Sequence, residues 1–225
     1  MGRLAFLLFI GIGGAAILIS LGLWQVQRLA WKEGVLADIE RRIAADPIPL
    51  PETLDPERDA YLPVEATGVW RADYIRVLVS QKQVGAGYRI IRPMILESGD
   101  ILVDLGFVPT AEADALRFEE GGPVRVVGNL QWPQEVDGFT PEPDRAGNIW
   151  FARDVPAMAD ELGTQEVLVV RREAQENGPV SPLPVDTAAI PNDHLQYAIT
   201  WFSLAIIWVG MTVYFLRRAP RPEEA

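Results

Sequence analysis

Apolar and polar positions divide this chain into three parts. The runs 4–23 and 195–216 contain no charged residue and are about 20 and about 22 residues long. A helix rises about 1.5 Å per residue, so each run can cross a hydrocarbon core about 30 Å thick. The pattern predicts a membrane α hairpin, with a first span and its exit motif at 1–32, an inserted domain at 33–191, and a second span with a short tail at 192–225.

Short runs rich in β-branched and aromatic residues follow one another through the central segment, with turn-forming residues between them. The predicted strands are 61–69, 74–81, 87–96, 100–108, Pro123–Leu130, 149–153 and 166–171. The first helix is predicted to continue to Ala45, before a Pro-rich loop at 46–58, and a short helix is predicted at Val155–Leu162. We therefore expect an extracytoplasmic α+β domain, mainly an antiparallel sheet or a small barrel.

Charge and composition narrow the possible functions. The net charge is −11, and the segment from Glu33 to Asp193 holds 29 acidic against 14 basic residues. Such a surface repels nucleic acid, so we expect no nucleic-acid partner. The absence of cysteine excludes disulfides, thiolate nucleophiles and covalent haem attachment.

Basic residues at the two spans give opposing signals about orientation. Arg217, Arg218 and Arg221 follow the second span, which by the positive-inside rule places both termini in the cytoplasm and the central domain outside. Arg28 and Lys32 follow the first span, against that rule. A bound anionic group would explain these extra cations. The first span lacks a clean A-x-A cleavage site, so we expect it to be retained rather than removed as a signal peptide.

The exit of the first span gathers aromatic, amide and cationic side chains. Gln25, Arg28 and Lys32 follow the spacing of one helix face, which Trp24 and Trp31 overlap. One interpretation is an interfacial aromatic belt with basic side chains extending to the headgroups. The other is a recognition face for an anionic amphipathic ligand such as a haem propionate.

The start of the second span carries the only histidine of the chain. His194, Tyr197 and Trp201 share a helix face by their spacing. An ionisable residue at membrane depth favours function, and a neutral imidazole is a good axial ligand for haem iron. The alternative is a helix N-terminus that faces water, with Asn192 or Asp193 as its cap.

Other chemistry has little support in these residues. A single histidine at the membrane boundary leaves no Ser–His–Asp triad or multi-histidine metal site for the central domain, so we expect no enzyme. The segment from Gly11 to Ala15 offers small residues four apart, which favours close packing between the spans or with a partner helix.

Two membrane-proximal motifs resemble those of a known family. LGLWQVQRLAWK at 21–32 resembles the LGxWQxxRxxWK signature of the surfeit-locus family of cytochrome c oxidase assembly factors, and HLQYAITWF at 194–202 resembles its HLxYAxTWF segment. Weaker matches lie between them in family order, at 61–64, 87–88, 103–109 and 126–130. One departure is Leu105, where the family commonly has arginine before the Gly-Trp/Phe-Val-Pro turn.

The resemblance implies a bacterial inner-membrane assembly factor for haem-copper oxidases that binds haem a and helps to insert it into subunit I. It implies His194 as the ligand of the haem iron. We extend supporting roles to a further set by helical spacing: Trp24, Gln25, Arg28, Tyr197 and Trp201. Expected partners are oxidase subunit I, haem a synthesis or other assembly factors, and membrane lipid. Alternatives are a haem-free chaperone of subunit I, a sensor, whose tail after Leu216 is short for an output domain, or a membrane enzyme.

Overall fold

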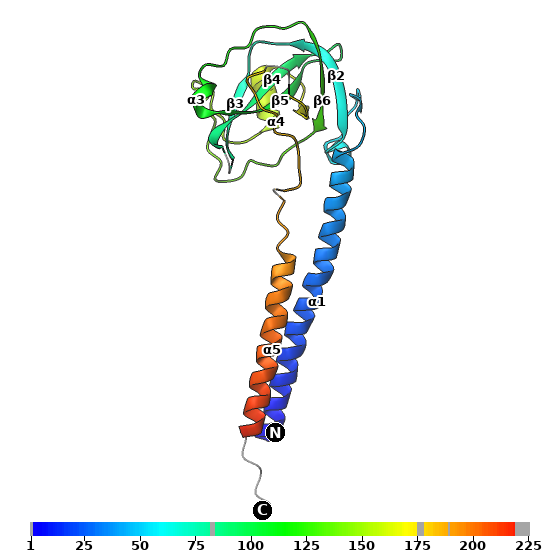
Figure 1. Cartoon of the computed structure of the whole chain (residues 1–225), viewed down its shortest axis with the longest axis vertical. Coiled ribbons are helices and arrows are strands. Elements are labelled where there is room, and N and C mark those ends of the chain that lie inside the picture. Colours follow the sequence, from blue (N-terminus) through cyan, green and yellow to red (C-terminus); the bar gives the residue numbers. More distant parts are fainter. Residues whose placement is uncertain (1, 82–83, 175–177, 189, 219–225) are drawn as a thin grey trace, which may run out of the picture. The chain divides into compact units, whose positions relative to one another are not determined.

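The computed structural model describes residues 2–81, 84–174, 178–188 and 190–218. The chain forms two compact units, Met1–Asp38 with Thr187–Ala225, and Ile39–Asp186. The first unit holds most of helix α1 (Arg3–Ile43) and the whole of helix α5 (His194–Arg218). The two helices run side by side and antiparallel (Figure 1).

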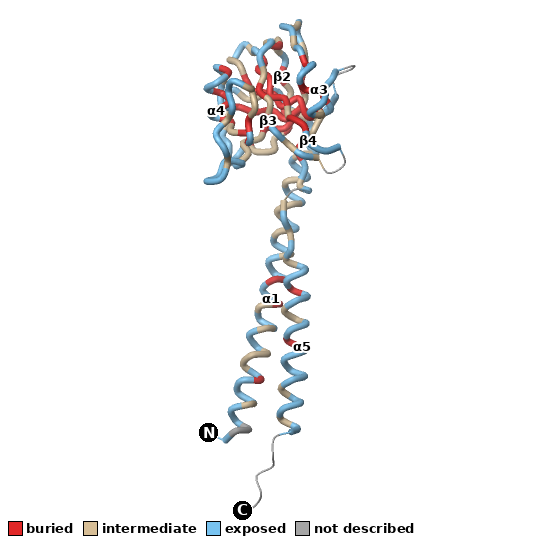
Figure 2. The backbone as a smooth tube through the Cα atoms, turned by 90° about the vertical axis from the view of Figure 1, so that its left-hand side faces the viewer, coloured by how far each residue is buried: buried red, intermediate tan, exposed pale blue. Residues whose placement is uncertain are grey.

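Both helices keep apolar side chains on their outer surface. Phe9, Ile12 and Ile206 are among their most exposed residues, whereas few positions are buried (Figure 2). A core helix of a soluble protein would bury such side chains, and each helix is long and apolar enough to cross a membrane. The prediction of two terminal spans is therefore confirmed.

The second unit is built on a seven-stranded sheet that closes on itself. Its strands are β1 (Ile48–Pro49), β2 (Pro63–Trp70), β3 (Ile75–Gln81), β4 (Gly85–Ile95), β5 (Ile101–Pro109), β6 (Pro123–Leu130) and β7 (Leu168–Arg171). The order is β1-β2-β6-β7-β5-β4-β3, and a further antiparallel pairing joins β2 to β4. The pairings β1–β2 and β5–β7 are parallel and the rest antiparallel. The prediction of a small, mainly antiparallel barrel is confirmed.

Hydrophobic side chains fill the barrel and the layer beneath helix α4 (Val155–Leu162). Met94, Val103 and Leu130 belong to one cluster, and Met158 and Leu168 to the other. Helix α4 begins at its predicted residue, where the Asp154 side chain caps it, and ends at Gly163 in the left-handed conformation.

Several local predictions need correction. Helix α1 ends at Ile43 rather than Ala45. The segment 46–58, predicted as loop, contains β1 and the start of helix α2 (Pro56–Asp59), and the short helix α3 (Thr110–Ala113) was not predicted. Asp55 before Pro56 is the helix-start signal that was missed.

The predicted strand at 149–153 is wrong. Ile149 and Trp150 make only isolated bridges, to Asp144 and Val77. The backbone then leaves the sheet because the N–H of Arg153 is held by the Glu135 carboxylate at 2.9 Å.

Candidate functional site

Small residues on α1 allow α5 to approach closely. A Cβ atom at Gly11 would lie 2.2 Å from Thr212, and one at Gly14 would lie 2.5 Å from the Trp208 ring. The Trp208 indole N–H donates to the Gly11 carbonyl at 3.0 Å. This contact agrees with the packing role expected for the segment that begins at Gly11.

At the other end of this interface, His194 and Gln25 meet across the two helices. The His194 Nδ1 and the Gln25 Oε1 are 2.8 Å apart. Gln25 is 8% exposed and His194 is half-buried. With the Gln25 oxygen in this position, the contact favours the tautomer that carries the proton on Nδ1, whose Nε2 lone pair is available to a metal ion. Two residues predicted separately from two motifs thus form one polar pair.

The other predicted residues make no hydrogen bond to this pair among the described residues. The Arg28 guanidinium lies 3.9 Å from the centre of the Trp31 ring. Trp24 and Tyr197 are 54% and 55% exposed, and Trp201 is half-buried. Gln25 therefore faces α5, whereas Arg28, one turn further on, stacks on its own helix. The roles predicted for these side chains in haem binding stay predictions.

A second polar atom near His194 is buried. The Oδ1 atom of Asn192 has no hydrogen-bond partner in the part of the chain that the structure describes. A buried amide oxygen without a donor is costly, so this atom is suited to accept a hydrogen bond from a bound group. Asn192 precedes α5 by two residues, at the mouth of the helix pair.

The metal chemistry open to this site is narrow. Across residues 2–81, 84–174, 178–188 and 190–218, no three His, Cys, Asp or Glu side chains are grouped so that they could hold a metal ion. A single imidazole is sufficient only where most ligands of the metal come from a cofactor, as in haem. The donor set thus fits an axial ligand rather than a metal ion bound by protein alone.

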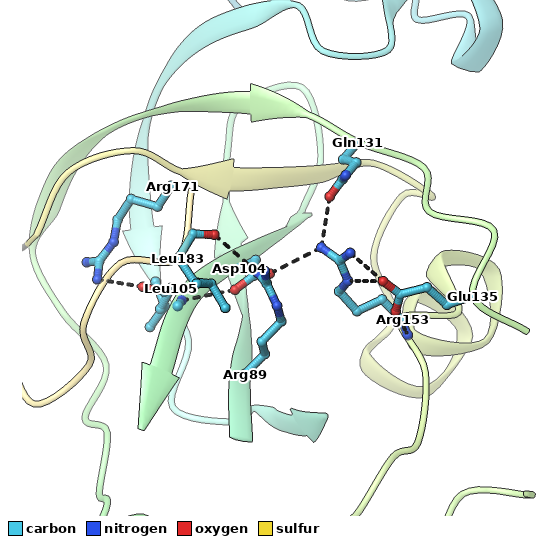
Figure 3. Close-up of polar contacts among 9 residues, drawn as sticks. Arg89, Asp104, Leu105, Gln131, Glu135, Arg153, Arg171 and Leu183 are labelled. Carbon is cyan, nitrogen blue, oxygen red and sulfur yellow. Dashed lines mark hydrogen bonds and ion pairs between the residues drawn. The ribbon is translucent and has the colours of Figure 1, made fainter. Parts of the chain in front are cut away.

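The β domain contains a buried charge cluster that sequence reasoning missed (Figure 3). Asp104 on β5 is fully buried, accepts hydrogen bonds from Arg89 and from the Gly106 N–H, and lies 3.7 Å from Arg153. Arg153 in turn donates to Glu135 and to the Gln131 side chain. The signal available in the sequence was a single acid inside the apolar run ILVDLGFVP.

Burial and ion pairing act against each other in this charge cluster. Burial raises the pKa of the Asp104 carboxyl, and the guanidinium groups of Arg89 and Arg153 oppose that effect. Burial alone would also raise the pKa of Glu135, but the hydrogen bonds and charge of Arg153 outweigh it and lower the pKa. We interpret the cluster as structural, because Asp104 is inaccessible and its neighbours complete its hydrogen bonds.

The departure at Leu105 lies next to this cluster. Leu105 is buried, and its carbonyl accepts a hydrogen bond from Arg171 at 2.7 Å. The next residue, Gly106, has a φ of +114°, and a Cβ there would lie 2.0 Å from the Ser181 carbonyl oxygen. Only glycine fits, so the turn in the family motif is retained although the arginine is not.

Fold and site together define a class: a membrane protein with two spanning helices and a β domain inserted between them in the sequence. Its one histidine is the first residue of the second helix.

Residues 13–206 match the model of the SURF1 family. The chain is 31% identical to surfeit locus protein 1 of Rattus norvegicus, over 96% of this chain and 76% of the relative. It is 31% identical to a SURF1-like protein of Monosiga brevicollis, over 91% and 88%, and 28% identical to one of Rickettsia conorii, over 95% and 91%.

The chain therefore belongs to the SURF1 family. This confirms the resemblance drawn from the two membrane-proximal motifs. Both motifs, at 21–32 and 194–202, lie within the matched residues. One of these relatives, that of Rickettsia conorii, is bacterial.

Proposed function

We propose that this protein is an assembly factor for haem-copper oxidases that holds haem a at the junction of its two spans and assists its insertion into subunit I. The observation that carries the proposal is the hydrogen bond between His194 and Gln25. Membership of the SURF1 family supports the general role in oxidase assembly. The haem-binding step rests on the geometry of the helix pair.

The residues present fit a haem ligand. A histidine that binds a metal ion usually donates its second ring N–H to an acceptor, which fixes the tautomer and the ring orientation. Gln25 supplies that acceptor from the neighbouring helix, so the Nε2 lone pair of His194 is ready before any ligand arrives. When bound, haem supplies an iron atom whose axial position accepts a neutral imidazole.

The residues around the pair suit the rest of an amphipathic macrocycle. Trp24 and Tyr197 offer exposed aromatic surface, which favours contact with a flat apolar ring. Arg28 and Lys32 provide cations for carboxylate groups, and this would explain basic residues on the side of the membrane where the positive-inside rule disfavours them. Asn192 Oδ1 offers a further acceptor.

We propose that the protein lies in the bacterial inner membrane, with both termini in the cytoplasm and the β domain in the periplasm. Arg217 and Arg218 in the last turn of α5 support this orientation. The proposed partners are oxidase subunit I, which would receive the haem, and the enzymes or factors that deliver haem a.

The same hydrogen bond favours one other function, that of a haem-free chaperone for subunit I. Polar side chains can join two spanning helices without any ligand. The His194–Gln25 pair would then only fasten α1 to α5, as the Trp208–Gly11 hydrogen bond does at the opposite end. The two functions differ in whether Nε2 of His194 is used.

The test is to purify the full-length protein in detergent from cells that make haem a and to record its optical spectrum and pyridine haemochrome. We expect stoichiometric haem a, loss of the bound haem in His194→Ala, and weaker retention in Gln25→Ala by about 10–100-fold. Gln27→Ala is the matched control, because Gln27 is an exposed glutamine on the same helix. A colourless wild type, from cells rich in haem a, would favour the haem-free chaperone.

A second measurement needs no haem. The chain has one histidine, so a ¹⁵N-imidazole spectrum reports on His194 alone. We expect the Nδ1–H tautomer in the haem-free wild type and in Gln27→Ala, and its loss in Gln25→Ala. An Nε2–H tautomer in the wild type would contradict the proposal that Nε2 is free for a metal ion.

A further inference from the structure

A small cavity in the β domain is lined by two residues that each carry a buried N–H donor without a partner among the described residues. Trp70 on β2 and Arg171 on β7 are 5% and 6% exposed and line the same cavity, whose volume is about 100 Å³. Neither the Trp70 Nε1 nor the Arg171 Nε has a hydrogen-bond partner among the described residues. Buried donors are nearly always satisfied, so two such atoms at one cavity indicate an acceptor that belongs there.

Arg171 brings a buried cation to this cavity. Arg171 donates to the carbonyls of Leu105 and Val180, and no described carboxylate is hydrogen-bonded to it. Figure 3 shows its guanidinium at the Leu105 carbonyl, apart from the Asp104 carboxylate, which Arg89 and Arg153 already neighbour. The ion pairs of that cluster join Arg89 and Arg153 to Asp104 and Glu135, and Arg171 takes part in none of them.

A second buried arginine reinforces the positive potential at Trp70. Arg92 is 5% exposed and donates only to the carbonyls of Arg71 and Glu119 within the described chain. Its guanidinium carbon lies 5.1 Å from the centre of a Trp70 ring. Neither buried guanidinium is hydrogen-bonded to a carboxylate in the described chain, although Asp104 and Asp73 act on Arg171 and Arg92 through space.

We infer that the cavity between Trp70 and Arg171 is a binding site for a small oxyanion, a carboxylate or a phosphate group. The Trp70 indole N–H and the Arg171 Nε–H would each donate to one of its oxygens, and the buried guanidinium groups would balance its charge. A cavity of this size has room for several water molecules, so it is large enough for such a group. Arg125 and Glu173 also line it, and Arg125 is already paired with the Glu65 carboxylate.

This site lies within the β domain and uses no residue of the helix pair, so it is independent of the proposed haem function. The alternative occupant is ordered water, which would satisfy both donors without any preference for anions. The two occupants differ in charge, and an anion titration separates them.

The test uses the full-length protein in detergent with ¹⁵N-labelled tryptophan. The chain has seven tryptophans, and the signal missing from Trp70→Phe identifies the Trp70 indole. We titrate sodium phosphate and sodium acetate separately, against sodium chloride at the same ionic strength. We expect a saturable shift of the Trp70 indole signal with at least one of the two oxyanions, and the more effective one identifies the phosphate or the carboxylate source.

Two variants keep the result interpretable. Arg171→Gln should lower the affinity for the oxyanion at least about tenfold, because it removes a charge-assisted donor. If Arg171→Gln does not fold, Trp70→Phe is the second variant, because it retains an aromatic ring but lacks the indole N–H. We expect it to weaken oxyanion binding as well, as measured by calorimetry. Arg145→Gln is the control, since Arg145 lies at another cavity and pairs with Glu161. A Trp70 signal that follows ionic strength alone, or equal affinity in all the variants, would overturn the site.

Discussion

The helix pair and the β domain both bury polar side chains, but they satisfy them in different ways. In the β domain, each carboxylate oxygen of the buried Asp104 accepts a hydrogen bond, from Arg89 or from the Gly106 N–H, and Arg153 adds an ion pair. Between the helices, His194 has one partner, Gln25, and keeps a free ring nitrogen. The charge cluster around Asp104 stabilises one structure. The His194–Gln25 pair, by contrast, leaves one imidazole nitrogen available to a ligand.

Burial of a polar group does not by itself mark a functional site. Asp104 is more deeply buried than either His194 or Gln25, yet hydrogen bonds and an ion pair within its own domain hold its carboxylate. What distinguishes the helix pair is an imidazole nitrogen with an unused lone pair, on a side chain that is only half-buried.

Replacement of Asp104 by asparagine should produce the largest loss of stability. The change leaves Arg89 and Arg153 facing a neutral amide in a buried position, which costs about 3–5 kcal/mol of unfolding free energy. Denaturant unfolding of the detergent-solubilised protein measures it. Asp114→Asn is the control, because that carboxylate pairs with Arg76 but its side chain is 90% exposed. An equal loss in both variants would show that the Asp104 cluster does not stabilise the domain.

Replacement of Gly14 by valine should separate the two helices. Its Cβ would lie 2.5 Å from the Trp208 ring, and such overpacking costs about 1–3 kcal/mol. The ¹⁵N-imidazole spectrum of His194 should then lose the Nδ1–H tautomer, although residue 14 is three helical turns from Gln25.

The control for this experiment is Gly13→Val, one residue away, where a Cβ meets nothing within 4 Å. It changes helix propensity by the same amount and leaves the interface intact. If Gly13→Val altered the imidazole spectrum as much as Gly14→Val, close packing at Gly14 would not be what holds the histidine in place.

Replacement of Arg28 by alanine should weaken haem binding while leaving the helix pair intact. Arg28 is exposed and stacks on Trp31, so its loss removes a cation for a propionate but no interhelical contact. We expect affinity to fall about 3–10-fold, measured by haem titration. Arg217→Ala, at the opposite end of α5, should leave it unchanged. Unchanged affinity in Arg28→Ala would remove this residue from the site.

The smallest effect is expected at Asp59 in the β domain. The hydrogen bond from Arg58 lowers the pKa of Asp59 to about 2. This carboxylate therefore adds stability above its ordinary pKa of about 4, and the contribution is lost as the pH falls from there to about 2. Because the Arg58 side chain is 67% exposed, the contribution is below about 1 kcal/mol. Asp59→Asn should remove this pH dependence; an unchanged acid limb would contradict the assignment.

Sequence reasoning identified the regular elements well where local signals were strong. Charge-free runs of sufficient length indicated both spans, and the helix Val155–Leu162 was predicted to the residue, with Gly163 as the signal for its end. It failed where a tertiary contact overrides the local pattern. The segment 149–153 has strand-like composition, but the contact between Arg153 and Glu135 turns it away from the sheet.

The sequence by itself determined that this chain has two apolar spans around a β domain and that its single histidine lies at the start of the second span. Those features depend on composition and period, which are local. Tertiary structure decided that His194 meets Gln25, that β2 pairs with β4 to close the barrel, and that Trp70 and Arg171 border one cavity. Each of these joins residues far apart in the chain, and no local spacing specifies which of the many possible partners a side chain will meet.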